Sequence, residues 1–211
     1  MKSGINYFLA LGFFLLTAFL SGCATKTVKE GAFQKAQWET KAMIKNLKEN
    51  KNQSLTIDIY AIKNERARFE ISALLGYQVA SLVMSPSDIS YAIYPQKTFF
   101  YGKNSDRAFR RIIDLPLHPM NLANIAFDEP IRGPGWKCTL GADGFLTECE
   151  NIQRQMKAVW SDRKEGKKKV VLTGPQFEMQ WHFGVPQTEV QFKDDLFTLR
   201  QPSGFKAIQI N

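Results

Sequence analysis

The stretch FEISALLGYQVASL, residues 69–82, holds two strand-like runs that meet at a short apolar turn. In residues 69–73, apolar side chains alternate with polar ones, which is the period of two expected of a half-buried strand. Turn tips are usually built from Gly, Pro, Asn, Asp and Ser, yet this one carries Leu74 and Leu75. The stretch therefore predicts a hairpin with an apolar tip.

The same alternation recurs along the chain with turn residues in between, as in SPSD (85–88). Strands are predicted at residues 54–62, 68–74, 77–84, 88–94, 97–101, 156–162, 168–174, 176–183, 196–202 and 205–211. Closely spaced strands with short turns favour an antiparallel meander that curls towards a barrel. The chain is long enough for one domain with a substantial core.

Two short helical patterns interrupt the strands, at residues 105–113 and 119–127. Ser105 is a predicted N-cap of the first, and Pro119 lies near the start of the second. Helices of two or three turns are not stable alone and must cover an apolar surface. They either complete a solid core or form a lid over an apolar pocket, and composition does not decide between these. The predicted lid and cavity residues are Phe109, Ile112, Ile113, Leu115, Leu117, Met120, Leu122 and Ile125.

The chain begins with a short apolar run from Tyr7 to Leu20 behind a single early charge, Lys2. This layout is typical of a bacterial signal peptide, and the run is shorter than the ~20 residues that a spanning helix prefers. An uncleaved membrane helix is the alternative. Residues 24–36 are polar and predict a tether, with a short helix near residues 33–38.

The signal region ends in Leu20-Ser21-Gly22-Cys23, which resembles the lipobox of bacterial lipoproteins. The resemblance implies cleavage before Cys23, which then carries a diacylglyceryl group and an N-acyl chain. We therefore expect a cleaved signal peptide (1–22), a lipidated tether (23–37) and one domain (38–211). Ala24 after the cysteine implies, by analogy with enterobacterial sorting, the outer membrane facing the periplasm.

The formal net charge is +8, so the surface suits anionic lipid headgroups or an acidic partner protein. An exported chain rarely meets nucleic acid. The run Lys167-Lys168-Lys169 and the pair Arg110-Arg111 are interpreted as solvated faces.

Cys138 and Cys149 lie symmetrically about Asp143-Gly144, a favoured two-residue hairpin turn. Counting outward places the cysteines opposite each other at a hydrogen-bonded position, where Cα atoms are ~5.5 Å apart. In an oxidising envelope this predicts a disulfide. A zinc site is not expected, because the two histidines have no ligand spacing to the cysteines.

No arrangement of reactive groups typical of an enzyme occurs in the sequence. Asp194-Asp195 falls in a predicted turn, and His182 falls on the polar side of a strand. We expect no enzymatic activity, no metal and no cofactor beyond the lipid on Cys23.

Strands, paired short helices and more strands in a lipidated envelope protein resemble the LolB family of outer-membrane lipoprotein receptors, whose fold is shared with the carrier LolA. The match is strongest over residues 69–130. FEISALLGYQVASLVMS looks like the family's strand–loop–strand, and RIIDLPLHPMNLANIAFDEP is similar to its lid region. The resemblance implies an open half-barrel of about eleven strands, with a short helical lid over an apolar cavity.

The family resemblance also implies a function: a monomer that accepts acylated lipoproteins from a LolA-like carrier and helps insert them into the membrane. The turn Leu74-Leu75-Gly76 matches the family's membrane-inserting loop, with Leu74 in place of its proline. Alternatively, Leu74 and Leu75 fold back into the core. The rival function is a structural or assembly lipoprotein that binds another envelope protein without carrying lipid.

Overall fold

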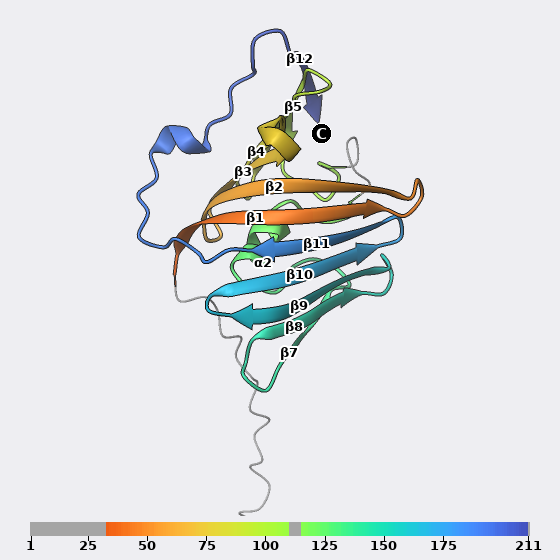
Figure 1. The fold of residues 1–211 in the computed structure, drawn as a ribbon. Coiled ribbons are helices and arrows are strands. Elements are labelled where there is room, and N and C mark those ends of the chain that lie inside the picture. The colour runs from red at the N-terminus through yellow and green to blue at the C-terminus, as the bar shows by residue number, and fades with distance from the viewer. Residues whose placement is uncertain (1–32, 110–114, 211) are drawn as a thin grey trace, which may run out of the picture.

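The computed structural model of the chain describes residues 33–109 and 115–210, apart from the side chain of Leu74. Within these residues, twelve strands form one curved sheet (Figure 1). The strands are β1 Lys35–Asn46, β2 Lys51–Ile62, β3 Arg66–Ala73, β4 Gln78–Met84, β5 Asp88–Ile93, β6 Thr98–Lys103, β7 Lys137–Leu140, β8 Leu146–Asn151, β9 Met156–Lys164, β10 Lys167–Gly174, β11 Phe177–Phe183 and β12 Lys206–Ile210. The helical elements are η1 Leu74–Gly76, α2 Met120–Ala126 and η2 Asp194–Phe197.

The sheet consists of two antiparallel meanders that meet in the middle. The strand order is β12-β6-β5-β4-β3-β2-β1-β11-β10-β9-β8-β7, so β1 and β11 join the two halves. The predicted mainly β, open curved sheet is confirmed. The sheet has twelve strands instead of about eleven, and the strand predicted at residues 205–211 is present as β12, which pairs parallel to β6 instead of continuing the antiparallel meander.

Alternation of side chains explains why these segments are strands. Along β2, Leu55, Ile57 and Ile59 are buried on the face that the sheet curls around, while the intervening residues face outward. The helix α2 lies against this concave face (Figure 1). The core is therefore the layer between the sheet and the segment that holds α2.

Three sequence predictions about secondary structure are wrong. β1 was not predicted, and it begins at Lys35, inside the expected tether and in place of a helix near residues 33–38. Residues 105–109 form turns instead of the start of a helix. Residues 196–202 form no strand; they belong to a connection from β11 to β12 that contains η2. The second predicted helix is present as α2, with Pro119 as its N-cap.

The β7–β8 hairpin also differs from the two-residue turn that was predicted. Residues 142–144 form its loop, closed by a hydrogen bond from the Gly141 N–H to the Phe145 carbonyl, with Gly144 at φ 82°. This is the three-residue loop that ends in a left-handed glycine. A register shift beside Thr139 then brings Cys138 opposite Cys149.

None of the helices in the described part of the chain has both the length and the hydropathy that crossing a bilayer requires.

Candidate functional site

The concave face of the sheet is the candidate site, because it gathers most of the buried apolar side chains. Trp38, Ile59, Phe69, Tyr91 and Trp181 lie on five strands and are almost fully buried. Its polar groups are paired: the indole N–H of Trp181 donates to Thr40 Oγ1, which donates to the Ile57 carbonyl. One exception is the buried indole N–H of Trp160, which has no hydrogen-bond partner among the described residues.

The described residues 104–109 and 115–132, here called the cover segment, lie across this face. Its side chains pack directly on the sheet in the part that the structure describes. The ring of Phe127 meets Trp38 edge-on at 5.0 Å between centroids, and Phe33 packs on both. At the other end, the Tyr91 hydroxyl donates to the Ala108 carbonyl over 2.9 Å.

The predicted lid residues fall on this segment. Phe109, Leu115, Leu117, Met120 and Ile125 are buried against the sheet side, and Leu122 is half-buried. Ile112 and Ile113 lie outside the described residues. In the described residues, the side chains predicted to form the lid therefore pack directly on the concave face of the sheet.

Lys168 fastens the C-terminal end of α2 to strand β10. Its ammonium donates to the carbonyls of Ile125 and Ala126 at 2.9 and 2.6 Å, and pairs with Asp128 at 2.8 Å. A cation at this position complements the negative end of the helix dipole. Burial lowers the pKa of Lys168 from 10.5 to about 8, although Asp128 acts in the opposite direction.

Glu129 fastens the same end of the cover to the other half of the sheet. It forms an ion pair with Lys63, between β2 and β3, at 3.3 Å, and both side chains are almost inaccessible. Arg132 approaches the second carboxylate oxygen at 3.5 Å from the surface. Adjacent acidic residues thus pair with lysines from the two halves of the sheet.

Further polar contacts hold the cover near its ends. Arg154 donates to the Pro116 carbonyl at 2.6 Å and pairs with Asp106 at 2.9 Å. Asn104 donates to the Ser85 carbonyl at 2.6 Å. In its described residues the cover is therefore attached mainly through side chains and carbonyls, and it adds no strand to the sheet there.

These anchors were missed by sequence reasoning. Lys168 was interpreted as part of a solvated face, which is wrong for this residue because it is buried. Its position offered a signal: Lys168, Val170 and Leu172 alternate on the buried side of β10. The acidic pair Asp128-Glu129 after α2 was the complementary signal.

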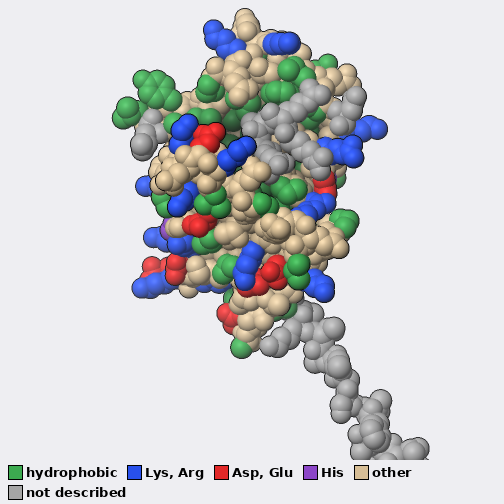
Figure 2. Space-filling model, turned by 90° about the vertical axis from the view of Figure 1, so that its right-hand side faces the viewer, with side chains coloured by type: hydrophobic (Ala, Val, Ile, Leu, Met, Phe, Trp, Pro, Cys, Tyr) green, Lys and Arg blue, Asp and Glu red, His purple; other side chains and the backbone are tan. Residues whose placement is uncertain are grey.

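The apolar turn between β3 and β4 projects into solvent. Leu75 is 94% exposed and has φ 67°, a left-handed conformation that is rare for a non-glycine residue. Tyr77 is 72% exposed, and Gly76 beside it has φ 77°. The alternative in which Leu75 folds back into the core is therefore wrong. Figure 2 shows hydrophobic side chains interspersed with Lys and Arg on one face of the molecule.

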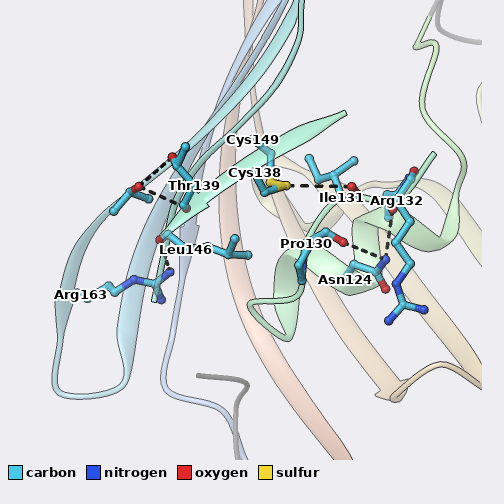
Figure 3. The surroundings of a disulfide bond; sticks show 11 residues. Asn124, Pro130, Ile131, Arg132, Cys138, Thr139, Leu146, Cys149 and Arg163 are labelled. Atoms are coloured by element: carbon cyan, nitrogen blue, oxygen red, sulfur yellow. Dashed lines mark hydrogen bonds between the residues drawn. A yellow bond between two sulfur atoms is a disulfide. The ribbon is translucent and has the colours of Figure 1, made fainter. Parts of the chain in front are cut away.

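The cysteines are joined by a disulfide between β7 and β8 (Figure 3). Their Cα atoms are 4.0 Å apart, closer than the ~5.5 Å expected from a hydrogen-bonded position, because the register shift places them at a narrower pair. Cys138 Sγ lies 4.0 Å from the carbonyl oxygen of Ile131, near the end of the cover. The disulfide thus joins the two strands of the edge hairpin next to the end of the cover.

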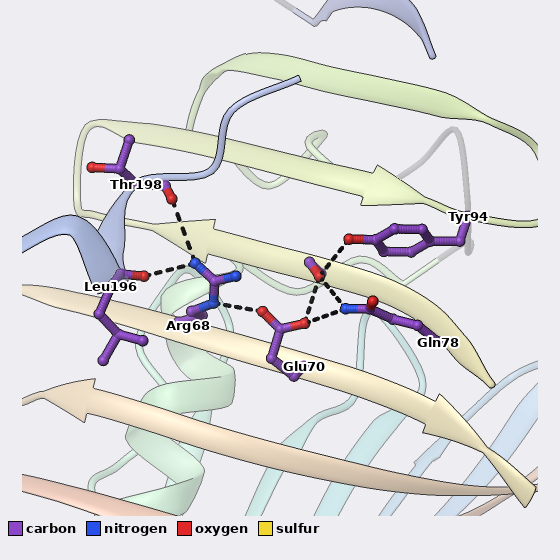
Figure 4. A network of polar contacts seen from close by, with 7 residues as sticks. Arg68, Glu70, Gln78, Tyr94, Leu196 and Thr198 are labelled. Atoms are coloured by element: carbon purple, nitrogen blue, oxygen red, sulfur yellow. Dashed lines mark hydrogen bonds and ion pairs between the residues drawn. The ribbon is translucent and has the colours of Figure 1, made fainter. Parts of the chain in front are cut away.

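On the convex face, the connection from β11 to β12 is held by Arg68 (Figure 4). Its guanidinium donates to the carbonyls of Leu196 and Thr198 and pairs with Glu70. A cleft of about 660 Å³ lies between this connection and the sheet. Beside it, burial and the neighbouring carboxylates of Glu39 and Glu70 raise the pKa of Asp58.

The residues considered for catalysis do not come together. His182 is exposed on β11, and Asp194-Asp195 lies in η2 with Asp194 paired to Arg66 at 3.1 Å. Among the described residues, no group of three His, Cys, Asp or Glu side chains is placed to hold a metal ion.

The chain matches no protein-family model and no curated protein sequence. Solved structures align with it at low identity. A LolA superfamily protein from Nitrosomonas europaea is 9% identical, with a TM-score of 0.44, covering 80% of this chain and 91% of that one. A DUF1329 family protein from Desulfovibrio piger is 12% identical, with a TM-score of 0.46, covering 79% and 90%.

A third structure, a candidate outer membrane lipoprotein-sorting protein domain from Vibrio parahaemolyticus, is 7% identical, with a TM-score of 0.47, covering 77% of this chain and 88% of that one. Because the identities are 12% or lower and the TM-scores are below 0.5, these likenesses carry no conclusion about ligand or activity.

Proposed function

We propose that this chain is a non-enzymatic outer-membrane lipoprotein that accepts acylated lipoproteins from a periplasmic carrier and helps insert them into the membrane. In this proposal the acyl groups on Cys23 anchor a single domain that faces the periplasm. Acyl chains of the cargo occupy the concave face.

One observation carries the proposal: the apolar face is closed by a separate segment held through side-chain anchors, instead of by another sheet. Such a segment can be displaced while the twelve-strand sheet stays intact. A guest chain would then gain the apolar contact that the cover gives up. The exposed Leu75 turn supports the insertion step, because an apolar tip gains solvation in the bilayer boundary.

The test uses a photo-crosslinking amino acid at one of two positions on neighbouring strands. Phe69 on β3 faces the cover, whereas Tyr60 on β2 faces outward. After incubation with a carrier loaded with acylated lipoprotein, we expect crosslinks to the acyl group from position 69 and none from position 60. Circular dichroism verifies that both variants are folded. Equal crosslinking at the two positions, or none at position 69, contradicts the proposal.

The rival function, an assembly lipoprotein without lipid cargo, is favoured by the direct packing of Phe127 on Trp38. Native mass spectrometry of the full chain distinguishes the two. Co-purified acyl cargo supports the receptor, whereas a cargo-free mass with a tightly bound protein supports the assembly role. Correct sorting of lipoproteins after depletion of the chain would also remove the receptor role.

A further inference from the structure

A second cavity, of about 300 Å³, opens at the end of the sheet where β1 begins and the β9–β10 hairpin turns (Figure 1). Its apolar lining comes from the aromatic rings of Phe33, Trp38 and Phe145, with Ala126 and Pro186 beside them. Its polar lining is mostly basic and comes largely from the hairpin. The cavity therefore presents an apolar wall next to a group of cations.

The hairpin turn places two lysines opposite each other. Glu165 and Gly166 have φ of 53° and 77°, as a tight two-residue turn requires, and Lys164 pairs with Lys167 in the strand register. Like charges directly opposite each other on neighbouring strands are destabilising. Within the described residues, Lys164 forms one ion pair, with Glu165 at 3.9 Å, and Lys167 forms none.

The other two cations of the cavity, Arg163 and Lys168, already form ion pairs within the chain. A register shift near Asp162, which has φ 52°, turns Arg163 towards the cover, where it pairs with Asp128 at 2.7 Å and lies over the Phe145 ring. Lys168 shares the same carboxylate. Asp128 and Glu165 are the acidic groups in the lining, so the cations outnumber them, and the lysine pair at the mouth has one distant counter-ion, Glu165 at 3.9 Å from Lys164.

We propose that this cavity binds a phosphate group carried by an amphiphile, such as an anionic phospholipid headgroup. The phosphate lies between Lys164 and Lys167, and the adjoining apolar part lies against Phe33, Trp38 and Phe145. The volume is at the lower limit of small-molecule sites, about 300–1,000 Å³. It suits a headgroup with a short length of chain. This site lies at one end of the concave face, with which it shares Trp38, and its phosphate contacts do not depend on the proposed function.

The test measures binding of dihexanoyl phosphatidylglycerol by calorimetry, with the full-length chain held in a maltoside detergent that contains no phosphate. The double variant Lys164→Gln/Lys167→Gln is expected to bind about tenfold more weakly. The matched control is Lys48→Gln/Lys51→Gln, which removes two lysines around the β1–β2 turn at the opposite end of the sheet. It is expected to bind like the unmodified chain.

Inorganic phosphate distinguishes the source of the anion. Competition by phosphate alone identifies a simple phosphate site, whereas binding of the lipid without such competition identifies a headgroup site that needs the apolar wall. The proposal is overturned if the unmodified chain binds no phosphatidylglycerol, or if both double variants lose affinity equally. Neither result affects the acyl crosslinking at position 69, so the two proposals fail independently.

Discussion

At the scale of single residues, Leu75 combines two unfavourable features. Its side chain is 94% exposed and its backbone is left-handed. A left-handed conformation costs an L-residue roughly 1–2 kcal/mol. Folding alone does not explain a leucine here, because glycine would adopt the same turn without that cost.

Replacing Leu75 should therefore separate stability from membrane contact. Leu75→Gly is expected to raise the free energy of unfolding by up to about 1 kcal/mol, because strain is relieved. Leu75→Asn, which tolerates the left-handed region, should change stability little. Both variants should insert lipoproteins into liposomes more slowly than the unmodified chain. An unchanged insertion rate would assign the turn no membrane role.

Lys168 is expected to make the free energy of unfolding depend on pH. Its pKa of about 8 in the folded chain lies below the ordinary 10.5, so between these pH values the unfolded chain binds more protons. The contribution of Lys168 to the free energy of unfolding therefore rises with pH from about 8 to 10.5. In denaturant titrations, we expect the free energy of unfolding of the unmodified chain to rise relative to that of Lys168→Met as the pH increases over this range. A decrease would show that the pair with Asp128 outweighs burial.

At the scale of elements, the cover segment depends on a few anchors. A buried ion pair that loses one partner leaves an uncompensated charge, which costs about 3–5 kcal/mol. Glu129→Gln should destabilise the chain by about that amount, because Lys63 is buried beside it. Urea unfolding measures the effect.

Arg132→Gln is the control for Glu129, because Arg132 meets the same carboxylate from an exposed position. Exposed ion pairs contribute about 0–1 kcal/mol, so little change is expected. Equal losses in the two variants would contradict the assignment of Lys63 as the principal partner.

The disulfide stabilises the edge hairpin by joining β7 to β8. Replacing both Cys138 and Cys149 with Ser should lower the free energy of unfolding by about 2–3 kcal/mol, from the gain in entropy of a short loop in the unfolded chain. Hydrogen exchange should increase mainly in β7 and β8. Faster exchange spread evenly over the sheet would indicate that the disulfide holds the whole core.

At the scale of the whole molecule, the regular alternation of β2 to β6 and β9 to β11 predicted the sheet. β1 was not predicted as a strand, because its inward positions after Trp38 hold Thr40 and Ala42, which give little contrast between an apolar and a polar face. The Thr40 hydroxyl is buried only because it accepts a hydrogen bond from Trp181 and donates to the Ile57 carbonyl. These partners are distant in sequence, so periodicity could not identify them.

Residues 196–202 illustrate the opposite error. Their alternation resembles a strand, but β1 already occupies the free edge of β11, so they cross the convex face on the way to β12. The candidate site shows the same limit. The apolar residues of the cover were predicted from their spacing, whereas the anchors depend on lysines that the fold brings from elsewhere.

The position of β1 at the centre of the sheet has a consequence for biogenesis. Thr40 of β1 pairs with Phe183 of β11, so the earliest strand of the described residues has its second edge covered only after almost all the other strands have been synthesised. Until then a nascent chain presents an open ladder of backbone groups, the kind of surface that promotes misassembly. The ribosome must release nearly the entire polypeptide before the two halves can dock, which makes maturation a late and cooperative event.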